Sequence, residues 1–85
     1  MYTRPRWRGN TLILNVRAEP PFALAEAYLS KDRGKLRRVP GDLGGDAVQL
    51  EFPNAKAKLQ SKKTARIVLS EDEAQHWMVL YLEVP

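Results

Sequence analysis

Residues 48–60 read VQLEFPNAKAKLQ, and this stretch carries the clearest structural pattern in the chain. Apolar and polar residues alternate over 48–52 and again over 55–60, which is typical of strands with one buried face. Pro53-Asn54 between them favours a turn. Because proline excludes the tight type I′ turn, we expect an antiparallel hairpin with a four-residue loop. Good helix formers in 55–63 leave a helix there as the alternative.

Three other segments read as strands. Thr11–Arg17 and Thr64–Leu69 are apolar and rich in β-branched residues, and turn-forming residues precede the first of them. A short strand over Leu36–Val39 lies between glycine and proline residues. These segments and the expected hairpin predict an antiparallel sheet.

A helix is expected near residues 21–31. Pro20-Pro21 suits a first helical turn, Leu24 and Tyr28 have helical spacing, and Gly34 is a candidate stop. Near the C-terminus, Ser70–Glu73 matches a capping box.

That capping box favours a helix over 71–84, although the apolar run Trp77–Leu82 is also compatible with a buried strand. The expected fold class is therefore α+β: a curved antiparallel sheet of about four strands packed on one helix, with a C-terminal helix or strand.

The chain has 85 residues, which predicts one domain over 11–85 preceded by a basic N-terminal arm over 1–10. It has no cysteine, which excludes disulfides and thiolate metal sites. Small domains gain stability from disulfides, metals or partner subunits, so self-association remains open. No signal peptide or membrane-spanning segment is recognised, and a cytoplasmic location is expected.

Nothing in the sequence predicts catalysis. His76 is the only histidine and precedes an apolar run, where a structural role is the simpler reading. Residues 41–46, GDLGGD, match neither a phosphate-binding loop nor a complete calcium-binding loop. We therefore expect no enzymatic activity, no cofactor and no metal site.

Charge carries the functional prediction. The net charge is +4, and the basic residues gather in 1–10, 31–40 and 56–66, with acidic stretches between them. If these blocks meet on one side of a sheet, they form a track that attracts polyanions. The residues expected to bind nucleic acid, single-stranded or without sequence specificity, are Arg4, Arg6, Trp7, Arg8, Arg33, Lys35, Arg37, Arg38, Lys56 and Lys58.

Within that set the arginines and lysines would contact phosphate, and Trp7 would stack on a base. Trp7 is equally suited to cover an open edge of the core. The alternative function is a protein-interaction module, such as an accessory, inhibitor or antitoxin-like subunit. It would meet an acidic partner or a second copy of itself through its basic face, a strand edge or the apolar C-terminus.

Overall fold

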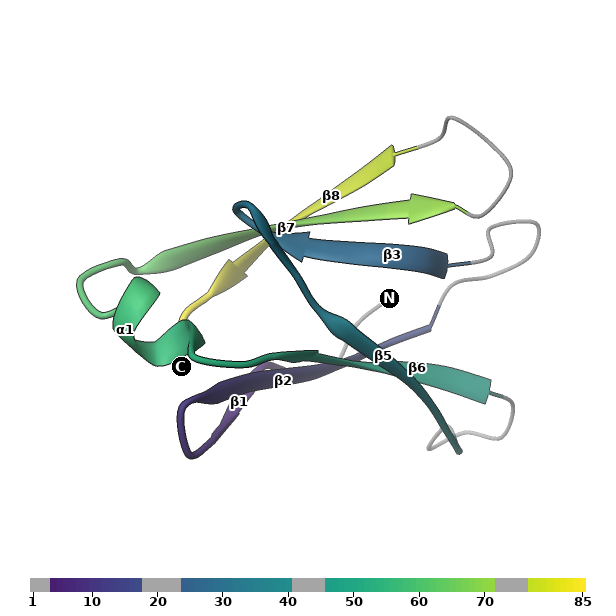
Figure 1. Ribbon diagram of the computed structural model, residues 1–85, viewed down its shortest axis with the longest axis horizontal. Helices are drawn as coiled ribbons and strands as arrows, with labels where there is room; N and C mark the ends of the chain where they lie inside the picture. The colour runs from purple at the N-terminus through teal and green to yellow at the C-terminus, as the bar shows by residue number, and fades with distance from the viewer. Residues whose placement is uncertain (1–3, 18–23, 41–45, 72–76) are drawn as a thin grey trace.

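Two antiparallel four-stranded sheets pack face to face in the computed structural model, which describes residues 4–17, 24–40, 46–71 and 77–85 (Figure 1). In spatial order, sheet A contains β1 (Arg6–Arg8), β2 (Thr11–Val16), β6 (Asp46–Phe52) and β5 (Lys35–Pro40). Sheet B contains β4 (Asp32–Arg33), β3 (Leu24–Leu29), β7 (Thr64–Glu71) and β8 (Trp77–Glu83). In the described ranges there is one helix, the four-residue α1 (Ala55–Lys58), which lies at one end of the two layers.

The core lies between the sheets and follows from strand alternation. Leu12, Leu14 and Val16 of β2 point inward with Leu50 and Phe52 of β6. From sheet B the inward side chains are Ala27, Leu29, Ala65, Ile67, Leu69 and Leu82. Full burial of a large aliphatic or aromatic side chain stabilises a fold by about 1.5–3 kcal/mol, so this cluster holds the layers together.

The predicted α+β class is wrong, because the expected helix near residues 21–31 is not formed where the structure describes it. Leu24–Leu29 is strand β3, which turns at Ser30-Lys31 into β4. Helical spacing between Leu24 and Tyr28 suggested a helix, but a strand buries Ala27 and Leu29 on one face against β7. Pairing with a central strand outweighs weak local helix propensity.

The predicted hairpin over 48–60 is half right. Residues 48–52 lie in β6, but β6 pairs with β2 and β5, and 55–58 form α1. Asn54 takes a left-handed conformation with φ 60° and ψ 21°, which turns the chain away from the sheet. Helical spacing then buries Ala55 and Leu59 together, and the Leu59 N–H donates to the Ala55 carbonyl at 2.9 Å.

At the C-terminus, the strand alternative is the one observed. β7 extends through Ser70 to Glu71, so the predicted capping box is wrong at its first residue. β8 pairs with β7 over its whole length. The intervening 72–76, which include His76, lie outside the described residues. Among the residues that the structure describes, no helix is long and apolar enough to cross a membrane.

The strands predicted over Thr11–Arg17, Leu36–Val39 and Thr64–Leu69 are confirmed. They are observed as β2, β5 and β7, with ends that differ by one or two residues. Part of the segment predicted as an N-terminal arm forms β1, which pairs with β2 through the two-residue turn Gly9-Asn10. This pairing places the arginines of β1 at one edge of sheet A.

Candidate nucleic-acid interface

The outer face of sheet A carries basic residues from both of its edges. Because side chains alternate along a strand, Arg6 and Arg8 of β1 lie on the opposite side from the core. Lys35 and Arg37 of β5 lie on that same outer side. All four are exposed. We call these four residues the basic face.

Strand register places two members of the basic face in one row. Arg6 lies opposite Ile13, Ile13 opposite Glu51, and Glu51 opposite Lys35. Three inter-strand steps of about 4.8 Å make this row about 14 Å wide at the backbone. Arg6 and Lys35 are far apart in sequence, and only the order of the strands brings them together. Ile13 is 1% exposed although it points outward, which is consistent with long neighbouring side chains covering it.

Glu51 orients two arginines of the basic face. Its carboxylate accepts a hydrogen bond from Arg8 and lies 3.8 Å from the Arg37 guanidinium. Arg37 also donates to the Gln49 side-chain carbonyl at 3.2 Å. The Glu51 side chain is only 13% exposed, whereas the two arginine side chains are 61% and 60% exposed. Since a guanidinium has five N–H donors, both retain donors that face solvent.

No ion pair or hydrogen bond engages the side chains of Arg6 or Lys35 within the described part of the chain. The basic face therefore presents four cations around one largely buried carboxylate. Such a surface can hold a row of phosphates.

Trp7 lies on the inner side of β1, away from the basic face. Its ring packs against the core cluster, and its indole N–H donates to the Pro85 carbonyl at 2.9 Å. The Lys56 ammonium lies 5.8 Å from the ring centroid, within the range of a cation–π contact. In this structure Trp7 joins the two ends of the chain.

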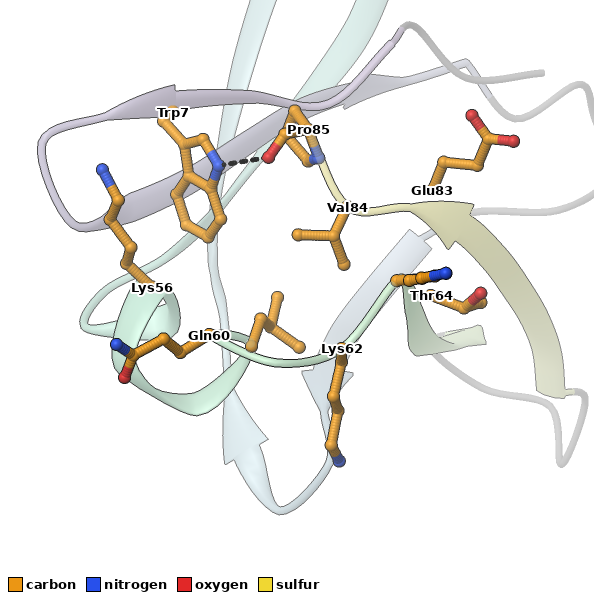
Figure 2. Close-up of a pocket in the computed structure, with 10 residues that line it drawn as sticks. Trp7, Lys56, Gln60, Lys62, Thr64, Glu83, Val84 and Pro85 are labelled. Carbon is orange, nitrogen blue, oxygen red and sulfur yellow. Dashed lines mark hydrogen bonds between the residues drawn. The ribbon is translucent and has the colours of Figure 1, made fainter.

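Trp7 and Lys56 line one side of a hollow of about 550 Å³ at the α1 end of the sandwich (Figure 2). Val84 and Pro85 lie across from them, and Lys62 extends away from the indole. Lys63 also lines the hollow, so its rim is basic. Trp7 and Lys56, two of the residues expected to bind nucleic acid, therefore lie together at this hollow and not on the basic face.

The remaining predicted residues are dispersed. Arg33 lies in β4 of sheet B, opposite Tyr28. Lys58 pairs with Asp32 across α1 and β4. Arg38 is exposed on β5 but alternates to the other side of the strand from Arg37. Arg4 precedes β1 and lines a hollow beside Tyr81 and Glu83.

Three neighbours of the basic face were not among the predicted site residues: Glu51, Gln49 and Arg17. Arg17 is exposed and directly follows β2, on the alternation shared by Ile13 and Asn15. That alternation was readable in the sequence. Glu51 and Gln49 were placed in the predicted hairpin, and only the pairing of β6 with β5 reveals that they lie beneath the arginines.

No protein-family model matches this chain, and no curated protein or solved structure shows significant similarity to it. Function is therefore inferred from the chain's own residues.

Proposed function

We propose that this protein binds nucleic acid without catalysis, through phosphate contacts made by the basic face. The observation that carries the proposal is the convergence of Arg6 and Arg8 from one edge of sheet A with Lys35 and Arg37 from the other. Neutralised phosphates release condensed counterions, and this release supplies most of the affinity of non-specific binding.

The shape of the surface favours backbone contact over base recognition. Direct readout of base edges in the major groove of duplex DNA uses a helix or a β-ribbon that enters the groove. The basic face is the flat side of a sheet, and the described part of the chain places no helix on it. Arginine forks bind phosphate oxygens in pairs, so single strands and exposed backbones suit this face without regard to sequence.

The test is fluorescence anisotropy with labelled single-stranded and duplex oligonucleotides over a series of salt concentrations. We expect affinity to fall steeply with salt, by about 0.7 logarithmic units per neutralised phosphate for single strands. Arg6→Ala combined with Arg37→Ala removes two of these contacts and should reduce the slope by about 1.4.

The matched control is Arg66→Ala combined with Arg33→Ala. These are exposed arginines of sheet B, and their loss changes the net charge equally. The control pair should retain nearly all of the salt slope. Equal losses in both pairs would assign binding to net charge alone, and no binding at low salt would exclude the function.

A further inference from the structure

The edge strand β8 exposes an apolar surface that the proposed function does not use. Trp77 is 62% exposed, Met78 41%, Val79 37% and Tyr81 65%. β8 is the last strand of sheet B, and in the described part of the chain no strand pairs with its outer edge. Trp77, Val79 and Tyr81 alternate onto the outer face of sheet B, whereas Met78 lies on the core side, opposite Leu69. Exposed apolar surface on small domains marks sites of association.

Among the described strands, the three other edge strands β1, β4 and β5 have features that oppose strand addition, and β8 does not. β4 has two residues, and β1 has three, of which two are arginines. β5 carries Lys35, Arg37 and Arg38 and ends at Pro40. Short strands, cations and proline are the devices by which proteins block edge-to-edge pairing. β8 has seven residues, no lysine, no arginine and no proline.

We propose that β8 pairs antiparallel with β8 of a second copy of this chain, and that the protein forms a two-fold symmetric dimer with one continuous sheet. The partner is identified by self-complementarity. When Val79 lies opposite Val79 of the partner subunit, Trp77 lies opposite Tyr81 of the partner subunit. In the same register Met78 lies opposite Leu80 of the partner subunit.

This register matches every exposed apolar side chain of β8 with another apolar one, and aromatic cross-strand pairs are among the stabilising ones. A shift that centres the axis on Leu80 instead sets Trp77 opposite a glutamate, Glu83. The paired segment Trp77–Tyr81 contains no charge, so no like charges meet.

The amount of surface is suited to a weak or moderate dimer. Aromatic side chains each bury up to about 150–250 Å², so two partly exposed aromatics per copy offer up to about 500 Å² in the pair. Stable interfaces begin near a total of about 1,200 Å², and Met78, Val79 and the edge backbone supply part of the remainder. We therefore expect a dissociation constant on the order of micromolar.

The symmetry has a consequence for the basic face. A two-fold axis that pairs antiparallel edge strands runs perpendicular to sheet B, so both copies place sheet A on the same side. The two basic faces would then point in one direction and bind a single polyanion bivalently. This consequence rests on the proposed function, but the dimer itself does not.

The experiment measures mass by sedimentation equilibrium over a wide concentration range, without nucleic acid. We expect a monomer–dimer equilibrium in the original chain. Val79→Lys places two ammonium groups opposite each other at the axis and should weaken the dimer about tenfold or more. Val39→Lys on β5, the edge strand of the other sheet, is the matched control and should leave the equilibrium unchanged.

A single introduced cysteine tests the register, because the chain has no cysteine of its own. Only residue 79 meets its own copy, so a short thiol cross-linker should trap Val79→Cys dimers at least about tenfold faster than Tyr81→Cys or Thr64→Cys dimers. Circular dichroism would establish that each variant is folded.

A chain that stays monomeric at high concentration, or equal cross-linking of the three cysteine variants, would overturn the proposal. A monomer in which Trp77→Ala lowers oligonucleotide affinity would assign this surface to bases instead. Since mass and cross-linking are measured without nucleic acid, failure of the dimer is distinguishable from failure of nucleic-acid binding.

Discussion

Gly34 shows how one residue permits the chain to pass between layers. It follows β4 of sheet B and precedes β5 of sheet A, and its N–H donates to the Ala27 carbonyl at 2.8 Å. A Cβ atom at this position would lie 2.5 Å from Cε1 of Phe52, which is itself 1% exposed. The buried ring has little room to move.

Gly34→Ala should therefore lower the free energy of unfolding by about 1–3 kcal/mol, the usual cost of overpacking. The measurement is denaturant unfolding followed by circular dichroism. Gly9→Ala is the comparison, because Gly9 has φ +61° but no atom near the added methyl group. The Gly9→Ala variant should lose about 1 kcal/mol of its free energy of unfolding, from backbone strain alone. Adding Phe52→Leu should restore part of the free energy of unfolding that Gly34→Ala loses. A Gly34→Ala protein of unchanged stability would contradict the steric argument.

Strand β1 of the β1–β2 hairpin has two faces with different roles, because its arginines face solvent and its tryptophan faces the core. Arg6 and Arg8 face outward, while Trp7 between them packs on the core and bonds to Pro85. Alternation along a strand separates these roles. The two interpretations of Trp7, as a stacking residue or as a core cover, therefore differ in a measurable way.

We expect Trp7→Ala to destabilise the fold by about 2–4 kcal/mol, somewhat below the loss of a fully buried tryptophan because Trp7 is half-buried. Trp7→Phe should retain most of the stability and all of the oligonucleotide affinity. Thermal unfolding and anisotropy on the same samples provide the two readouts. A large loss of affinity in the folded Trp7→Phe variant would instead support base stacking by the indole.

For the whole molecule, the contribution of the basic face to oligonucleotide affinity can be separated from the contribution of the net charge. The chain carries a net charge of +4, which alone gives some attraction to polyanions. Glu51 is the acid within the basic face, whereas Glu83 lies at the end of β8 in sheet B. Neutralising either one changes the net charge by the same amount.

Glu51→Gln should raise oligonucleotide affinity several-fold at low salt, because the adjacent arginines lose an intramolecular competitor for phosphate. The gain should vanish at high salt, where surface charges are screened. Glu83→Gln is the control and should change affinity much less. Identical gains in the two variants would show that net charge, not the basic face, controls binding.

The sequence alone predicts four of the eight described strands, β2, β5, β6 and β7. The alternating and β-branched patterns over Thr11–Val16, 48–52 and 64–69 are typical of strands with one buried face and favour no other secondary structure. It also determined the charge blocks and the absence of cysteine. These are local properties, and they do not depend on which segments become neighbours.

Tertiary packing overrode the predicted helix at Leu24–Leu29 and the predicted strand at 55–58, and it resolved the open alternatives at Trp77–Glu83. Leu24–Leu29 and Trp77–Glu83 are strands because each gains a long ladder with β7, and 55–58 form a helix because β6 already has two partners. Strand order also decided the site: Arg6 and Lys35 share a row solely because β2 and β6 lie between them. Strand pairing depends on the total side-chain burial in the whole sandwich. Segments far apart in the sequence contribute to that burial, so a short stretch of sequence does not predict it.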